Sequence, residues 1–181
     1  MTNNLIWIDL EMSGLDPDKH VILEIATIVT NSELTMVAEG PNLVIHHQDD
    51  SLETIDEWSR AHHEASGLLE KVRGSSYDCA AAEATTLDFL HSYAQKGKSP
   101  LCGNSVWQDR RFLSRHMPTL NAFLHYRNID VSTIKELAGR WYPTLPKPKK
   151  RKDHLALNDI KESIAELQYY REKVFRSSWK A

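Results

Sequence analysis

The sequence predicts an α/β protein in which a mixed β-sheet is flanked by helices. Strand-like segments cluster between Leu5 and His46, and helical segments alternate with short strands after them. This order of elements is typical of a sheet layer covered by helices. The chain has 181 residues, without repeats or a convincing linker. That length suits one domain with a proper core, so we expect a single domain over residues 1–181.

The first expected strands lie close together in the sequence. Leu5–Met12 and Val21–Val29 are runs of apolar, β-branched and aromatic residues separated by a turn-forming stretch. Leu34–Ala38 and Asn42–His46 continue the pattern, and Gly40-Pro41 predicts a bend or break between them. Such close spacing predicts an antiparallel meander.

The remaining segments predict helices and short strands in alternation. The first group comprises helical pieces over Ser51–Val72 with breaks at Ser59 and Ser66-Gly67, a helix over Tyr77–Tyr93 and a strand over Pro100–Asn104. The second comprises a helix over Val106–His116, a helical turn over Leu120–Leu124 and a strand over Tyr126–Val131. The last comprises a helix over Thr133–Tyr142 capped by Ser132 or Asp130, a Pro- and Lys-rich loop over Pro143–Asp153, and a helix over Leu155–Phe175.

Composition excludes several classes of protein. The formal net charge of −3 means that any contact with nucleic acid must be local. Cys79 and Cys102 lie far apart in apolar segments, which favours reduced thiols over a disulfide or a zinc site. The chain has no 18-residue apolar stretch, and the N-terminal segment is too polar for a signal peptide. We therefore expect a cytoplasmic protein without a membrane span.

Two carboxylates end the first expected strand. Asp9 and Glu11 are two residues apart, so both side chains point to one face of the strand. An exposed edge strand is the commoner origin of such a pair. Here the preceding residues are apolar, and two buried carboxylates need a positive partner. A hard divalent cation suits this role because such ions prefer oxygen ligands.

Two further acids and a histidine have suggestive positions. Asp109 lies one turn into the helix that follows the strand Pro100–Asn104, and Asp159 lies near the start of the last helix. His154 precedes Asp159 by five residues, which is about 1.4 helical turns, so the two do not share a helix face. His154 is better placed on the loop or at the first helical position. Each residue alone is more often an ordinary surface residue.

Together these residues form a pattern with a known counterpart. Ile6–Leu15 resembles the first exonuclease motif of the oligoribonuclease family, Gly103–Leu113 resembles the second, and His154–Ile160 fits the third, of the form H-x-A-x-x-D-I. His125–Arg127 and Asp130–Leu137 also resemble family segments. The resemblance implies an RNase-H-like exonuclease fold of the Asp-Glu-Asp-Asp-His type. It also implies a homodimer and 3′→5′ removal of nucleotides from very short single-stranded RNA, dinucleotides especially.

The resemblance covers nearly the whole chain, from about Asn4 to Phe175. Leu155 and Asn158 stand where more polar or acidic residues are expected in the family. The basic loop before His154 also varies within the family. None of these departures affects an expected metal ligand.

The resemblance assigns chemistry to the acids. Asp9, Glu11 and Asp159 are expected to hold one Mg²⁺ or Mn²⁺, with Asp9 bridging to a second ion and Asp109 helping through water. Two such ions, about 3.5–4 Å apart, clamp the attacking and leaving oxygens of a phosphodiester displacement. His154, whose unperturbed pKa is about 6.5, is the expected general base.

Substrate contacts follow less directly. Leu15 is expected to wedge against a base, and Trp58 to stack on one, although a turn residue and a core tryptophan are the plainer interpretations. His63 and Ser105 match family positions that contact the substrate backbone.

An anion site is expected near the helix over Thr133–Tyr142. Ser132 and Lys135 share a face near its N-terminus. With Arg127 from a dimer partner, and Tyr126 beside it, they are expected to cap a terminal 5′-phosphate. The basic run Lys147–Lys152 resembles a nuclear-localisation patch, but a solvated loop that attracts phosphates towards His154 is the favoured interpretation.

Two alternatives remain at the level of sequence. One is another exonuclease of the same superfamily, such as a proofreading subunit or a tRNA-trimming nuclease. The other is a non-catalytic nucleotide-binding module that kept the fold. Cleavage rates on substrates of different lengths would distinguish the first alternative from an oligoribonuclease. Loss of one of the acids would be the sign of the second.

Overall fold

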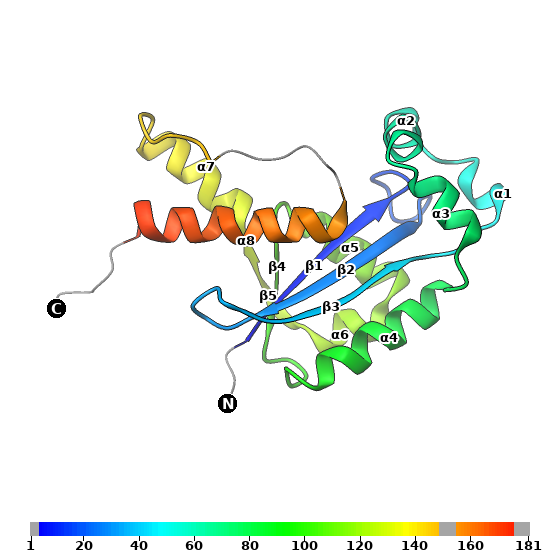
Figure 1. Cartoon of the computed structure of the whole chain (residues 1–181), viewed down its shortest axis with the longest axis horizontal. Coiled ribbons are helices and arrows are strands. Elements are labelled where there is room, and N and C mark those ends of the chain that lie inside the picture. The colour runs from blue at the N-terminus through cyan, green and yellow to red at the C-terminus, as the bar shows by residue number, and fades with distance from the viewer. Residues whose placement is uncertain (1–3, 149–154, 176–181) are drawn as a thin grey trace.

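The computed structural model describes residues 4–148 and 155–175. In these residues five strands form one mixed sheet in the order β3-β2-β1-β4-β5 (Figure 1). The strands are β1 (Leu5–Met12), β2 (Ile22–Thr30), β3 (Met36–Val44), β4 (Pro100–Gly103) and β5 (His125–Asp130). The first three strands pair antiparallel, as the predicted meander requires, whereas β4 pairs parallel with β1 and β5.

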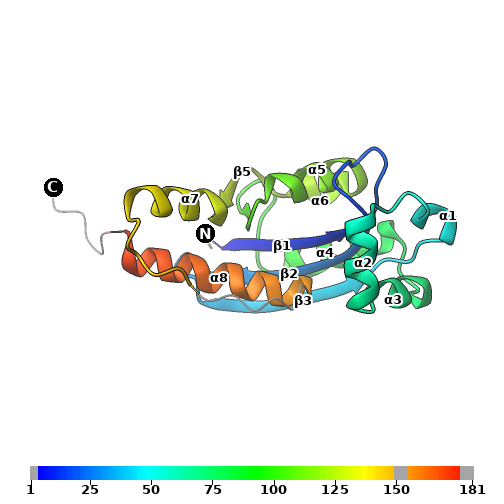
Figure 2. The same cartoon turned by 90° about the horizontal axis from the view of Figure 1, so that it is seen from above.

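Helices cover both faces of the sheet. They are α1 (Asp49–Leu52), α2 (Glu57–Ala65), α3 (Leu68–Gly74), α4 (Cys79–His91), α5 (Trp107–His116), α6 (Pro118–Phe123), α7 (Val131–Trp141) and α8 (Ala156–Lys173). Figure 1 shows α7 and α8 on one side of the sheet and α4 and α6 on the other. In Figure 2 the carboxyl end of β1 points towards α2.

The alternation of β1 side chains assigns each to a face. Ile6, Ile8 and Leu10 belong to the core shared with α4, α5 and α6, whereas Trp7 belongs to the core shared with α7 and α8. Because side chains alternate along a strand, Asp9 and Glu11 lie on the face of Trp7. The two carboxylates therefore point to the side that α8 covers.

Two local predictions were wrong. Gly40-Pro41 does not end a strand: both residues lie inside β3, at an irregularity where the pairing with β2 steps from Asn42 to Glu39. Proline is tolerated there because β3 is an edge strand. Gly40 is required by packing, since a Cβ at this position would lie 2.5 Å from the ring of Phe89 on α4.

Ser59 was the second wrong prediction, because it lies inside α2 rather than at a break. Its backbone N–H donates to the Asp56 carboxylate at 2.8 Å, which makes Asp56 the cap of α2. The break falls before Asp56, whereas Ser66-Gly67 does separate α2 from α3 as predicted.

The remaining boundaries agree with the predictions to within a few residues. Asp130 caps α7 by accepting from the Ser132 backbone N–H. Both cysteines are free thiols, as expected. No helix within residues 4–148 and 155–175 has the length and apolar character needed to cross a bilayer.

Candidate active site

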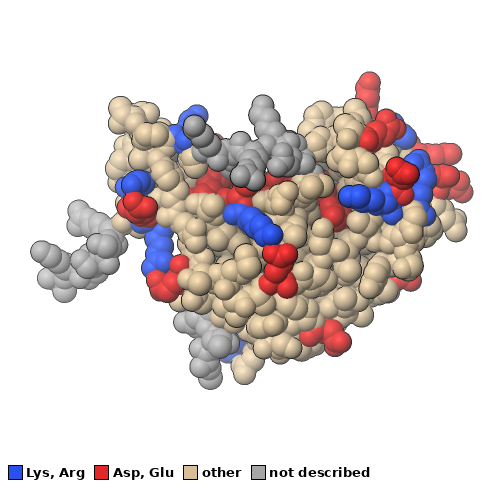
Figure 3. All heavy atoms as spheres, viewed as in Figure 1, with Lys and Arg blue, Asp and Glu red and all other residues tan. Residues whose placement is uncertain are grey.

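Three carboxylates meet at the end of β1. Asp9 and Glu11 come from β1 and Asp159 from the first turn of α8, and each offers an oxygen within 4.8 Å of the other two. Figure 3 shows one face of the molecule, in the view of Figure 1. Acidic side chains (red) are visible along its upper part, between α7 on the left and α2 on the right. The structure therefore brings together the strand pair and the distant Asp159.

Packing of α8 explains how Asp159 reaches the strand. Ala156 and Ile160 are four residues apart and fully buried in the core that contains Trp7. Residues three and four apart share a helix face, so Asp159 lies next to this buried stripe and faces β1. The first turn of a helix also favours a negative side chain, because of the helix dipole.

Asp109 supports the cluster from α5. Its side chain is buried, and Oδ1 accepts a hydrogen bond of 3.1 Å from the backbone N–H of Leu10, between the two β1 carboxylates. Burial raises the pKa of Asp109 to about 7. Asp109 is not one of the three residues whose oxygens lie within 4.8 Å of one another, so any part it takes in binding an ion is less direct.

Burial, with mutual repulsion as the second cause, determines the electrostatics of Asp9 and Glu11. Burial, followed by the charges of Asp109 and then Glu11, raises the pKa of Asp9 well above its usual value. Burial, followed by the charge of Asp159, raises the pKa of Glu11 to about 8. Without a counter-charge, these converging carboxyl groups resist ionisation. A hard divalent cation supplies that counter-charge and prefers oxygen ligands. The residues present fit a site for a hard divalent cation.

Glu24 is a fifth acid that the sequence analysis missed. It pairs directly with Glu11 in the register of β1 and β2, and only 4% of the residue is exposed. Burial raises its pKa, although hydrogen bonds from the Asn42 side chain and the Ala156 backbone act in the opposite direction. Ala156 is the first residue of α8, so Glu24 lies close to the start of the helix that carries Asp159. One feature of the sequence could have identified Glu24: it is the single charged residue in the otherwise uncharged strand β2.

His154 lies outside the described residues, as do residues 149–152 of the basic run. The role of His154 as general base stays a prediction. Leu155, the next residue along the chain, directly precedes α8.

Leu15 and Trp58 both present apolar surface to solvent. Leu15 is 70% exposed and Trp58 is 71% exposed. The Leu15 carbonyl accepts a hydrogen bond of 2.7 Å from Gln108 Nε2, which ties the turn after β1 to α5. Trp58 stacks on His62 with ring centroids 5.1 Å apart. Their exposure is compatible with base contacts, and the plainer interpretation of Trp58 as a core residue was wrong.

His63 lies in a different environment. It is buried, and its Nε2 lies 2.9 Å from the backbone carbonyl oxygen of Met12 at the end of β1. Burial lowers the pKa of the imidazole, which favours the neutral ring. His63 thus braces the strand that carries Asp9 and Glu11, and its contact with substrate stays a prediction.

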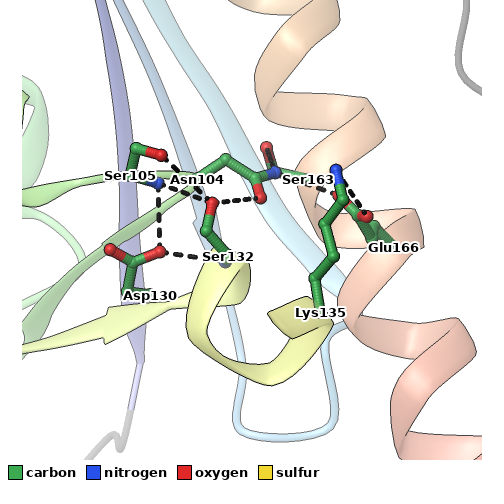
Figure 4. Close-up of polar contacts among 7 residues, drawn as sticks. All are labelled: Asn104, Ser105, Asp130, Ser132, Lys135, Ser163 and Glu166. Atoms are coloured by element: carbon green, nitrogen blue, oxygen red, sulfur yellow. Dashed lines mark hydrogen bonds and ion pairs between the residues drawn. The ribbon is translucent and has the colours of Figure 1, made fainter. Parts of the chain in front are cut away.

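Ser105, Ser132 and Lys135 form a second group, around the start of α7 (Figure 4). The Ser105 backbone N–H donates to Ser132 Oγ at 2.9 Å and to the Asp130 carboxylate at 3.0 Å. The two serine hydroxyls lie 3.2 Å apart. Lys135 follows one turn later, half exposed. The structure therefore brings Ser132 and Lys135, which the sequence assigned to the terminal phosphate, together with Ser105, which it assigned to the substrate backbone.

Tyr126 and Arg127 lie on β5, the strand at the other edge of the sheet. Tyr126 is 76% exposed, and the Arg127 guanidinium lies 5.3 Å from the centre of its ring. Both side chains are thus presented on the surface of an edge strand, where a second copy of the chain has access to them.

Comparisons with known proteins agree with this geometry. A family model described as an exonuclease matches residues 6–167. The oligoribonuclease of Pseudomonas putida is 61% identical over 170 residues, which cover 93% of this chain and 94% of that protein. The oligoribonuclease of Alcanivorax borkumensis is 59% identical over 171 residues, which cover 94% of each chain.

Solved structures show the same fold. Exonuclease I of E. coli in complex with a 5cy-dT13 oligonucleotide has a TM-score of 0.72 at 18% identity, covering 96% of this chain. The zinc-ion-bound form of its complex with single-stranded DNA has a TM-score of 0.74 at 17% identity. This chain spans only 42% of either structure's chain. The predicted RNase-H-like exonuclease fold is confirmed, and at 61% identity to a full-length relative this chain belongs to the oligoribonuclease family.

Proposed function

We propose that this chain is a 3′→5′ exoribonuclease that degrades very short oligoribonucleotides, dinucleotides above all, to 5′-mononucleotides. The observation that carries the proposal is the meeting of Asp9, Glu11 and Asp159 at the end of β1, with Asp109 behind them. It is supported by identity of about 60% to curated oligoribonucleases over most of the chain.

Asp9, Glu11 and Asp159 would hold Mg²⁺ or Mn²⁺, and Asp9 and Asp109 would help to hold a second ion. Bound ions of this kind stabilise the charge that develops on the attacking and leaving oxygens of the phosphodiester. His154 takes the proton of the attacking water, a role that suits an imidazole near neutral pH.

Other side chains of this chain bind and orient the substrate. Leu15 and Trp58 hold the two bases through apolar contact and stacking, which are tolerant of base sequence. Ser105 contacts the sugar–phosphate backbone of the substrate. His63 supports the same contact chiefly by bracing β1.

The far end of the substrate meets a phosphate cap, which we define as Ser132 and Lys135 of one subunit with Arg127 of the partner. Tyr126 lies beside Arg127 and closes the same end. We propose a cytoplasmic homodimer of single-domain subunits, in which each subunit lends this edge strand to the other. A cap of this kind selects short substrates, since longer ones must leave it unfilled.

The test is a length series. RNAs of two, three, five and seven residues, each with a 5′-phosphate, are incubated with Mn²⁺ or with EDTA, and a 5′-phosphorylated DNA dinucleotide is added for comparison. We expect the RNA dinucleotide to be cleaved fastest, by roughly tenfold or more over the longest substrate, since one or two charge-assisted hydrogen bonds carry the difference. Equal rates at all lengths would indicate the alternative superfamily exonuclease. Full activity in EDTA would refute the metal assignment.

A further inference from the structure

A buried carboxylate lies behind the phosphate cap. Glu166 of α8 is only 2% exposed. A charge this deeply buried is costly unless it is paired and hydrogen-bonded. Two of its partners are the Lys135 ammonium, 3.8 Å from Oε1, and the Asn104 amide, which donates to Oε2 at 3.2 Å. Lys135 belongs to the cap, and Asn104 contacts Ser132 of the cap.

The Asn104 side chain connects Glu166 with Ser132 (Figure 4). Asn104 Nδ2 donates to Glu166 and, at 2.7 Å, to Ser163 Oγ. Both contacts require the NH₂ group to point towards α8, so Oδ1 faces α7. Ser132 Oγ donates to that oxygen at 3.0 Å. The hydroxyl of Ser132 is thereby oriented through one intermediate side chain.

Ser163 and Glu166 belong to the same stripe of α8 as Asp159. The three residues are spaced by four and then three positions, which places them on one helix face. Seven residues correspond to about 10 Å along a helix. The helix α8 thus carries the proposed metal ligand Asp159 and, two turns further along, Glu166, which contacts Lys135 of the cap.

We infer that Glu166, with Asn104 and Ser163, is a positioning residue that holds Lys135 and Ser132 where they meet the 5′-phosphate. The inference rests on the proposed function, because it assigns a task to residues behind the same site. Glu166 does not reach the substrate. It acts through its ion pair with Lys135 and through the Asn104 amide.

A competing effect has the opposite sign. The negative charge of Glu166 opposes a nearby phosphate, so its removal would strengthen phosphate binding if charge alone mattered. Removal of the positioning contacts would weaken phosphate binding. The direction of the change in KM therefore separates the two effects.

The test uses Glu166→Gln, which keeps the size and one acceptor oxygen but removes the charge. Values of kcat and KM are measured with Mn²⁺ for one RNA dinucleotide bearing either a 5′-phosphate or a 5′-hydroxyl. We expect KM for the phosphorylated substrate to rise about tenfold, with kcat within about twofold and the hydroxyl substrate unaffected. Glu172→Gln, an exposed change of the same charge at the far end of α8, is the matched control and should resemble wild type.

A second variant checks that Glu166 acts through Lys135. In a Lys135→Ala background, Glu166→Gln should cost much less of the remaining preference for the 5′-phosphate than it does alone, because residues in one network are not additive. Equal losses in both backgrounds would contradict the pathway.

The outcomes separate the inference from the function. A wild-type protein without preference for the 5′-phosphate would refute the cap and, with it, the proposed length selection. A wild-type preference that Glu166→Gln leaves unchanged, or increases, would refute only the positioning role. A loss of kcat on both substrates would mean that the variant displaces α8, and would also overturn the inference.

Discussion

The fold holds Asp9, Glu11 and Asp159 close together although their negative charges repel one another. Burial is the largest cause of the raised pKa values of Asp9 and Glu11, and the charge of Asp159 raises both further. Such an arrangement is unfavourable for folding alone, so its retention is explained by a bound cation rather than by stability. Activity and stability should therefore respond in opposite ways when one carboxylate is neutralised.

Asp159→Asn tests this opposition at the scale of one residue. We expect the turnover rate to fall on the order of 100-fold or more, because a ligand that supports several kcal/mol of charge stabilisation is lost. In EDTA at pH 8 the melting temperature should rise or stay level, since Glu11 loses a repelling neighbour. Asp88→Asn, an exposed change on α4, is the control. Wild-type turnover in Asp159→Asn would exclude it as a ligand.

At the scale of elements, the active site depends on how α8 meets the sheet. The helix begins at Ala156, whose backbone opposes the rise in the pKa of the buried Glu24 of β2. The same helix reaches Lys135 of α7 and Asn104 after β4 through Glu166. α8 thus connects the antiparallel and the parallel halves of the sheet, on the face where Asp9, Glu11 and Asp159 lie.

Glu24→Ala should loosen the first turn of α8. The variant removes the buried carboxylate beside the Ala156 backbone, and loss of a polar neighbour costs about 1–3 kcal/mol for a buried group. Hydrogen exchange of the first turn of α8 should accelerate, and turnover should fall as Asp159 loses its position. Glu24→Gln keeps an acceptor and should retain most activity. Equal losses in the two variants would point to the charge of Glu24 rather than to its polar contact with the start of α8.

At the scale of the whole molecule, the acids make stability depend on pH and on metal. The folded protein raises the pKa of Glu11 to about 8, above its usual value of 4.5, so the folded state keeps a proton that the unfolded chain releases. Stability of the metal-free protein must then fall as pH rises between those two values, by up to about 1.4 kcal/mol per pH unit for one such proton.

Thermal unfolding at pH 6 and pH 8 measures this effect. In EDTA the melting temperature should be lower at pH 8, whereas saturating Mn²⁺ should abolish or reverse the difference, because the ion replaces the retained protons. Asp159→Asn should show a smaller dependence on pH than wild type. A metal-free protein with equal stability at both pH values would contradict the coupling of these carboxylates.

The sequence by itself determined most of the elements and singled out the acids of the first site. Apolar runs in Leu5–Met12 and Val21–Val29 are local signals, and so is the spacing of Asp9 and Glu11 on one strand face. Separated motifs placed Asp109 and Asp159 with them. These features follow from local periodicity and motif order, which a linear sequence contains directly.

Only the tertiary structure decided which polar side chains are buried together. Glu24 and Glu166 look like ordinary acids in the sequence, yet the first is buried opposite Glu11 and the second behind Lys135. Gly40-Pro41 looked like a break, and the pairing of β3 with β2 carries the strand through it. Strand register and the packing of α8 place residues together that lie far apart in the chain, and local patterns do not contain those distances.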